Sequence, residues 1–86
     1  MWSPLTPVWS KPAAKQLRKL GGNAAARVEA AVNRYAVSGL GDVTTMRTEP
    51  GSIRLKVGDF RIVFAISAAT HEMLISRVGD RKDIYD

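Results

Sequence analysis

Two runs in which apolar and polar residues alternate, residues 53–57 and 60–66, flank the dipeptide Gly58-Asp59. Alternation with a period of two is typical of a strand with one buried face, and a two-residue loop that begins with glycine joins antiparallel strands through a type II′ turn. A loop of this length fixes which residues lie opposite each other. The predicted pairs are Val57 with Phe60, Lys56 with Arg61, Leu55 with Ile62, Arg54 with Val63, and Ile53 with Phe64. One face of this hairpin is therefore apolar and needs a covering layer.

The first half of the chain contains two helical patterns that can provide this layer. Ser10 is a typical N-cap before a helix with proline in its first turn, and apolar residues recur at helical spacing up to Leu20. Gly21-Gly22 ends this pattern. A second helix is predicted with Asn23 as its N-cap, ending at Ser38-Gly39. Two helices joined by such a short turn indicate an antiparallel helical hairpin.

The remaining segments complete the predicted fold class. Pro4 and Pro7 restrict the stretch Thr6–Trp9 to an edge strand or an extended arm. Residues 39–45, rich in Gly and Thr, are expected to form a loop. We therefore predict an α+β fold, with the N-terminal helical hairpin packed on one face of a small antiparallel sheet. A chain of 86 residues is expected to form a single domain over residues 1–86.

A third strand is predicted over residues 73–78, ending at Gly79-Asp80, but its register depends on the length of the preceding loop. A four-residue loop turns Arg77 toward the core side, where an unpaired guanidinium would be costly. A five-residue loop, Ala68–Glu72, places Arg77 on the polar face instead. We therefore expect the longer loop, for which the inward residues are Leu74, Ser76 and Val78.

The polar face of the predicted sheet is basic. The register gathers Arg54, Lys56 and Arg61 there, Arg77 joins them, and Arg81 comes toward the same face just beyond the third strand. The exposed strand positions hold no acid to pair these bases, and opposed like charges cost a sheet about 0.2–1 kcal/mol. The chain also has a net charge of +5 and a pI of about 10.1. The alternative is an ordinary solvated face, but we favour a binding site for an anionic partner such as nucleic acid.

Several classes of protein are excluded by residues that are absent. There is no cysteine, so a disulfide scaffold, a zinc site with cysteine ligands and a thiol nucleophile are all excluded. A single histidine and few glutamates show no metal-ligand spacing, and we expect neither a metal nor a cofactor. No segment approaches the roughly 18 apolar residues of a membrane span. We expect a cytoplasmic protein that does not bind membranes.

Three segments, in this order, resemble the RelE/ParE superfamily of type II toxin–antitoxin toxins. They are the start of the first helix at residues 10–20, the hairpin at residues 53–64, and the closing residues 77–85. The closing pattern Val-Gly-x-Arg-x-x-x-Tyr is more similar to the RelE branch, which contains ribosome-dependent mRNA endonucleases, than to the ParE branch, which inhibits DNA gyrase. The resemblance covers residues 8–85 and implies the RelE-like microbial RNase type of fold.

The resemblance also implies roles for individual residues. Arg61 and Arg81 would act on the scissile phosphate as catalytic residues, and Tyr85 would stack on a base or assist proton transfer. The residues expected to bind RNA phosphates are Arg54, Lys56 and Arg77. One departure is Ser52, which stands where the best-known RelE pattern has lysine.

The implied activity is a metal-independent cleavage in which the 2′-hydroxyl of RNA attacks the adjacent phosphate. Because general acids and bases are scarce in the predicted site, we expect cleavage to need the ribosome to align the mRNA. The implied partners are a cognate antitoxin and a ribosome with mRNA in its decoding site. The alternatives are a gyrase inhibitor that acts by protein contact, as in the ParE branch, and an inactive relative that still binds an antitoxin.

Overall fold

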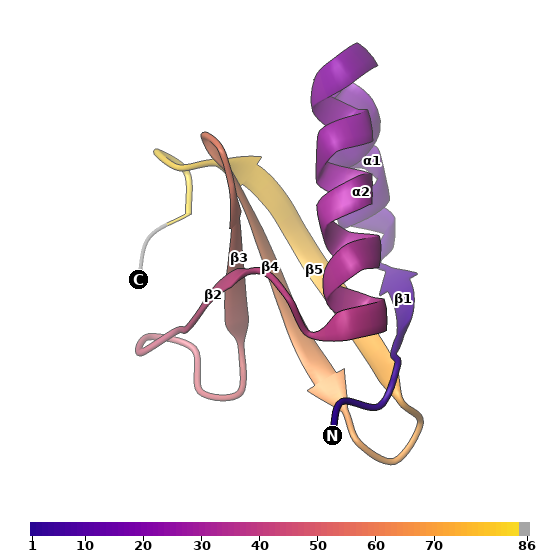
Figure 1. Cartoon of the computed structure of the whole chain (residues 1–86). Coiled ribbons are helices and arrows are strands. Elements are labelled where there is room, and N and C mark those ends of the chain that lie inside the picture. Colours follow the sequence, from indigo (N-terminus) through magenta and orange to yellow (C-terminus); the bar gives the residue numbers. More distant parts are fainter. Residues whose placement is uncertain (85–86) are drawn as a thin grey trace.

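The computed structural model describes residues 1–84, which form two helices and five strands (Figure 1). In chain order the elements are β1 (Thr6–Trp9), α1 (Lys11–Leu20), α2 (Gly22–Ser38), β2 (Asp42–Thr45), β3 (Ile53–Val57), β4 (Phe60–Ser67) and β5 (Glu72–Asp80). The two helices lie side by side against one face of the sheet, which we call the inner face; the opposite face is the outer face. The predicted α+β class and its layer order are confirmed.

The strands are arranged in the order β1-β5-β4-β3-β2, and all neighbours are antiparallel except β1 and β5, which are parallel. The predicted edge strand at Thr6–Trp9 is confirmed, since an edge position tolerates Pro7. The prediction of a loop over residues 39–45 was wrong, because Asp42–Thr45 pairs with β3. These four residues are all exposed and show no alternation, so the strand arises from pairing with β3 rather than from a local pattern.

Of the two helix N-caps predicted from the sequence, one is confirmed. The Ser10 hydroxyl accepts a hydrogen bond from the backbone N–H of Ala13 at 3.1 Å, as expected of an N-cap. The N-cap of α2 is Gly21, with φ of 63°, so the prediction of Asn23 in that role was wrong. A glycine pair can reverse the chain within one residue through positive φ angles, and the helix therefore starts before Asn23.

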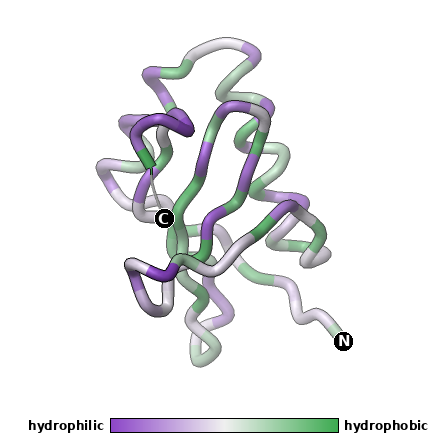
Figure 2. The backbone as a smooth tube through the Cα atoms, turned by 90° about the vertical axis from the view of Figure 1, so that its left-hand side faces the viewer, coloured by the Kyte–Doolittle hydropathy of each residue, from purple (hydrophilic) through white to green (hydrophobic). Residues whose placement is uncertain are grey.

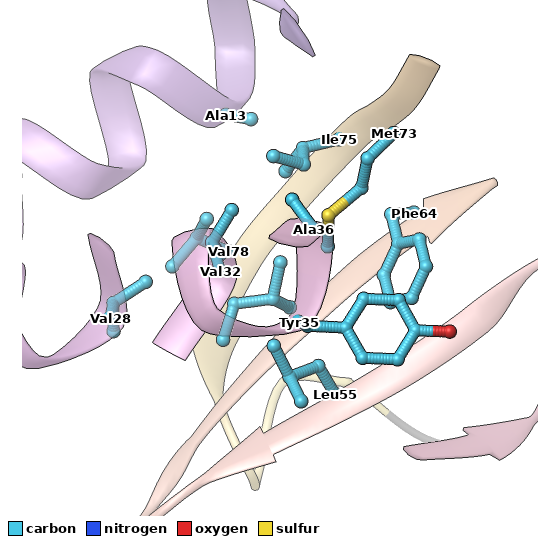
Figure 3. Close-up of a cluster of buried hydrophobic side chains, with 11 residues drawn as sticks. Ala13, Val28, Val32, Tyr35, Ala36, Leu55, Phe64, Met73, Ile75 and Val78 are labelled. Carbon is cyan, nitrogen blue, oxygen red and sulfur yellow. The ribbon is translucent and has the colours of Figure 1, made fainter. Parts of the chain in front are cut away.

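The core lies between the helices and the inner face (Figure 3). The ring of Tyr35 on α2 contacts that of Phe64 on β4, with centroids 5.1 Å apart, and that of Trp2 at 5.2 Å. Burial raises the pKa of the Tyr35 hydroxyl. Tyr35 lies on α2 and is therefore not part of the outer face. The buried residues of this cluster are Ala13, Val28, Val32, Tyr35, Ala36, Leu55, Ile62, Phe64, Met73, Ile75 and Val78.

The hairpin of β3 and β4 has the predicted register at all five pairs, from Val57 opposite Phe60 to Ile53 opposite Phe64. Gly58 has φ of 58°, as a two-residue turn of this type requires. Figure 2 shows the alternation along both strands as green and purple segments.

The predicted register of β5 was wrong in its first half. Ser67 pairs with Glu72, so the connection holds four residues rather than five. Met73 and Ile75 are therefore buried, whereas Leu74 is 41% exposed and Ser76 faces solvent. The shorter loop is favoured because it fills the core beside Phe64 with two large apolar side chains.

A β-bulge restores the expected placement of the second half of β5. Phe64 pairs with Ile75 and Val63 pairs with Arg77, which leaves Ser76 as the extra residue. The Ser76 hydroxyl donates a hydrogen bond to the Val63 carbonyl at 3.2 Å. Arg77 therefore lies on the outer face and Val78 is buried, as predicted, although a bulge rather than the loop length places them there. The strand also continues to Asp80 instead of ending at Val78.

Candidate nucleic-acid interface

The predicted basic residues lie on the outer face in two rows across the strands. Arg54, Val63 and Arg77 form one row, and Lys56, Arg61 and Gly79 form the next, two residues closer to the β3–β4 turn. We call the four charged residues of these rows, Arg54, Lys56, Arg61 and Arg77, the basic face. Three neighbouring strands thus bring together side chains that lie up to 23 positions apart in the sequence.

Apolar residues cover the centre of the outer face. Val63, Met46 and Ile84 are buried together there. The sequence did not predict the burial of Val63, because the alternation of β4 places this residue on the polar side. Gly79 makes room for the chain after β5, since a Cβ at this position would lie 3.1 Å from Cδ1 of Ile84. The segment before β3 and the segment after β5 therefore both fold over the outer face.

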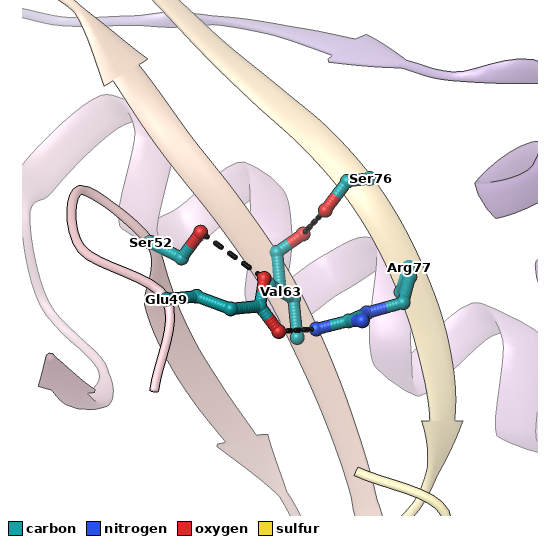
Figure 4. Close-up of polar contacts among 5 residues, drawn as sticks. All are labelled: Glu49, Ser52, Val63, Ser76 and Arg77. Carbon is teal, nitrogen blue, oxygen red and sulfur yellow. Dashed lines mark hydrogen bonds and ion pairs between the residues drawn. The ribbon is translucent and has the colours of Figure 1, made fainter. Parts of the chain in front are cut away.

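Glu49, in the segment before β3, brings a carboxylate onto the basic face (Figure 4). It forms an ion pair with Arg77, and the Ser52 hydroxyl donates to its Oε1 atom at 3.5 Å. In addition, Asp42 on β2 is the pairing partner of Lys56. The expectation that no acid accompanies these bases was therefore wrong, because Glu49 and Asp42 belong to segments whose positions on the sheet have no local sequence signal.

Arg61 and Arg81 both contact the β3–β4 turn, Arg61 through its side chain and Arg81 through its backbone. Nη1 of Arg61 donates hydrogen bonds to the carbonyls of Gly58 and Phe60, each at 2.9 Å, and the backbone N–H of Arg81 donates to the Asp59 carbonyl at 2.8 Å. A guanidinium has five N–H donors, so Arg61 keeps donors for a ligand. No acidic group of residues 1–84 forms an ion pair with Arg61, Arg81, Arg54 or Lys56.

Tyr85, the third residue with an implied catalytic role, lies outside the described residues. Within residues 1–84, no group of three or more His, Asp or Glu side chains is arranged to hold a metal ion. Neither of the two described helices combines the length and apolar character needed to cross a membrane.

A groove of about 500 Å³ lies beside the basic face, between the end of α1 and the end of β5. Its charged lining is mixed, because Lys19 and Arg77 are accompanied by Asp80 and Asp83. The basic face, in contrast, consists of four bases on β3, β4 and β5. Glu49, from the segment before β3, is ion-paired with Arg77, and Asp42 on β2 is the pairing partner of Lys56. The excess of positive charge is therefore larger on the basic face than in the groove.

The chain matches a known family model over most of its length. Residues 8–85 match the family model described as the ParE toxin of type II toxin–antitoxin system, parDE. No curated protein is significantly similar to the chain in sequence.

Solved toxin structures share the fold. The RelE–RelB complex from Pyrococcus horikoshii matches with a TM-score of 0.77 at 15% identity, covering 95% of this chain and 100% of that one. The intact RelBE complex from E. coli matches at 0.73 and 17% identity, covering 88% and 95%. The RelB–RelE complex from Methanococcus jannaschii matches at 0.72 and 20% identity, covering 92% and 95%.

Proposed function

The chain belongs to the RelE/ParE family of type II toxin–antitoxin toxins, and we propose that it cleaves translated mRNA on the ribosome. The observation that carries this proposal is the outer face, where the Arg61 side chain and the backbone of Arg81 both contact the β3–β4 turn, beside a surface that also holds a carboxylate. Cations that bind a phosphate and a group that accepts a proton are the two requirements of metal-independent RNA cleavage.

The nucleophile in this reaction is supplied by the RNA. The 2′-oxygen gives up its proton and bonds to phosphorus, the bond from phosphorus to the 5′-oxygen breaks, and the 5′-oxygen takes a proton. The products are a 2′,3′-cyclic phosphate and a 5′-hydroxyl. We assign Glu49, whose carboxylate is half-buried on the basic face, as the group that accepts the proton from the 2′-oxygen. Tyr85 donates the proton that the 5′-oxygen takes, in line with the resemblance of the closing motif.

Charge on the phosphate is stabilised by Arg61 and Arg81. The two hydrogen bonds from Arg61 to the turn carbonyls hold its guanidinium in place before the substrate arrives. Groups that need no reorganisation stabilise a transition state more than groups that must be ordered during the reaction. Arg54, Lys56 and Arg77 bind flanking phosphates, and Arg77 also orients Glu49 through their ion pair.

The partners proposed for this activity are the ribosome, which aligns the mRNA, and a cognate antitoxin, which inhibits the toxin in the cytoplasm. The proposal of an antitoxin partner is supported by the three solved relatives described above, each of which is a complex of RelE with RelB. A second candidate function is inhibition of DNA gyrase, and the observation that favours it is the ParE description of the matching family model.

The two candidates differ in what induction of the protein does to a translated message. We expect primer extension to detect cleavage at ribosome-bound codons, with growth arrest. Arg61→Ala and Arg81→Ala should each lower cleavage by roughly 10²–10³-fold, the range seen when one preorganised donor to a transition-state oxygen is removed.

Arg18→Ala is the matched control, because Arg18 is exposed on α1, away from the outer face, and its loss should leave cleavage unchanged. Intact mRNA together with accumulated covalent gyrase–DNA complexes would favour the ParE-like activity. Growth arrest that persists in both the Arg61 and the Arg81 variants would refute their catalytic assignment.

A further inference from the structure

Arg27 on α2 reaches the β3–β4 turn from the helix side of the sheet. Its Nη2 atom lies 2.8 Å from the position that a Cβ on residue 58 would take, so the guanidinium occupies space that a side chain would fill. Glycine at position 58 is therefore favoured by the positive φ of the turn, and a Cβ there would also displace the end of the Arg27 side chain.

Arg61 contacts the same residue from the outer face. Its Nη1 donates to the carbonyl of Gly58, so two guanidinium groups from different layers of the fold converge on one turn residue. The turn lies at the end of the sheet where β5 also ends, in the upper part of Figure 1, and α2 begins at that end. Arg81 joins this end through its hydrogen bond to Asp59.

Within the described part of the chain, residues 1–84, no ion pair compensates this convergence of positive charge. Asp59 lies in the turn and Asp80 pairs with Phe60 in the adjacent strand, yet neither forms an ion pair with Arg27 or Arg61 among residues 1–84. Like charges gathered without a partner lower the stability of the free protein, and an anion bound between them removes that repulsion. Such an arrangement is therefore expected of a ligand site rather than of a structural contact.

We propose that Arg27 binds a backbone phosphate of the RNA adjacent to the phosphate held by Arg61. The RNA strand then runs from the basic face over the β3–β4 turn and onto the first part of α2. This inference rests on the proposed nuclease function, because it adds a contact to the same RNA strand. It also extends the interface from the outer face to the helical layer.

The test compares Arg27→Gln with Arg34→Gln in the full chain. Arg34 is an exposed arginine seven positions further along α2, about two turns along the same side and further from the β3–β4 turn. The probe is a fluorescent single-stranded RNA with 2′-O-methyl groups, which cannot be cleaved. Its affinity is measured by anisotropy over a series of salt concentrations.

Loss of one phosphate contact lowers the salt dependence of single-strand binding by about 0.7 in log–log slope, equivalent to roughly fivefold in affinity at 0.1 M salt. We expect this change for Arg27→Gln, with a melting temperature equal to or above that of the wild type. Arg34→Gln should bind as the wild type does, and Arg27→Lys should retain most of the affinity.

The outcomes separate this inference from the proposed function. Wild-type affinity in Arg27→Gln, or an equal loss in Arg34→Gln, overturns the inference alone. A lowered melting temperature with unchanged RNA binding makes Arg27 a clamp on the turn and also overturns it. If the wild-type chain binds RNA but leaves ribosome-bound mRNA intact, the nuclease proposal fails while the Arg27 contact stands. No RNA binding by the wild type at low salt overturns both.

Discussion

Arg61 takes part in the fold and in the candidate site through different N–H groups of one side chain. One nitrogen closes the β3–β4 turn through the carbonyls of Gly58 and Phe60. The planar fork of a guanidinium allows this because its donors point in fixed directions, which a lysine ammonium cannot reproduce. The Arg61 guanidinium is therefore preorganised by its hydrogen bonds to the turn of the hairpin.

Glu49 is the residue on which the proposed proton transfer depends. Glu49→Gln keeps the size of the side chain but cannot accept the proton, so cleavage of ribosome-bound mRNA should fall by roughly 10²–10⁴-fold. The free energy of unfolding should change by less than about 1 kcal/mol, because the ion pair with Arg77 lies at the surface, with side chains that are 44% and 39% exposed.

The matched control for this variant is Glu72→Gln. Glu72 accepts a hydrogen bond from the Thr70 hydroxyl at the far end of β5 and should be dispensable for cleavage. Cleavage at the wild-type rate in Glu49→Gln would exclude Glu49 as the general base.

At the scale of elements, β5 is the strand that organises the molecule. It pairs with β1 on one side through Ile75 and with β4 on the other, and its bulge at Ser76 directs Arg77 outward. Beyond Ile75 this edge of β5 has no strand partner among residues 1–84. Gln16 on α1 takes that place, since its Oε1 atom accepts a hydrogen bond from the backbone N–H of Val78 at 2.7 Å.

Removal of this side-chain acceptor tests its contribution. Gln16→Ala leaves the partly buried N–H of Val78 without its partner, which should cost about 1–3 kcal/mol in the free energy of unfolding measured by urea denaturation. Gln16→Glu retains an acceptor oxygen and should remain within about 1 kcal/mol of the wild type. Equal destabilisation by the two substitutions would show that packing, rather than the hydrogen bond, accounts for the effect.

At the scale of the whole molecule, the sheet is covered on both faces by different means. The helices cover the inner face, whereas Met46 and Ile84 reach across the outer face to Val63. The second contact holds the segment that carries Glu49 and the segment that follows Arg81. Stability of the outer cluster and geometry of the candidate site are therefore coupled.

Truncation of Ile84 should expose this coupling. Ile84→Ala removes buried apolar atoms and should lower the free energy of unfolding by about 2 kcal/mol, the low end for such a change in a core. Cleavage should fall more than about tenfold even where the protein remains folded, because the segments are no longer held. Ile66→Ala is the control, since Ile66 is 37% exposed and lies outside the outer cluster. Parallel losses in the two variants would argue against the coupling.

The sequence alone was sufficient wherever structure depends on neighbours along the chain. Ser10 caps α1, Gly58-Asp59 sets the register of the hairpin, and the basic residues of β3 and β4 lie on the face that alternation predicts. In each case the signal and its consequence lie within a few residues, so periodicity and turn chemistry determine the outcome. The family resemblance depended on the same local segments.

The tertiary structure decided what depends on contacts between distant segments. β2 forms because β3 offers an edge, and the register of β5 follows from how Met73 and Ile75 fill the core, with a bulge compensating afterwards. Glu49 and Arg27 reach the candidate site from an irregular segment and from the helical layer. Their positions are set by packing over the whole molecule, which no local pattern encodes.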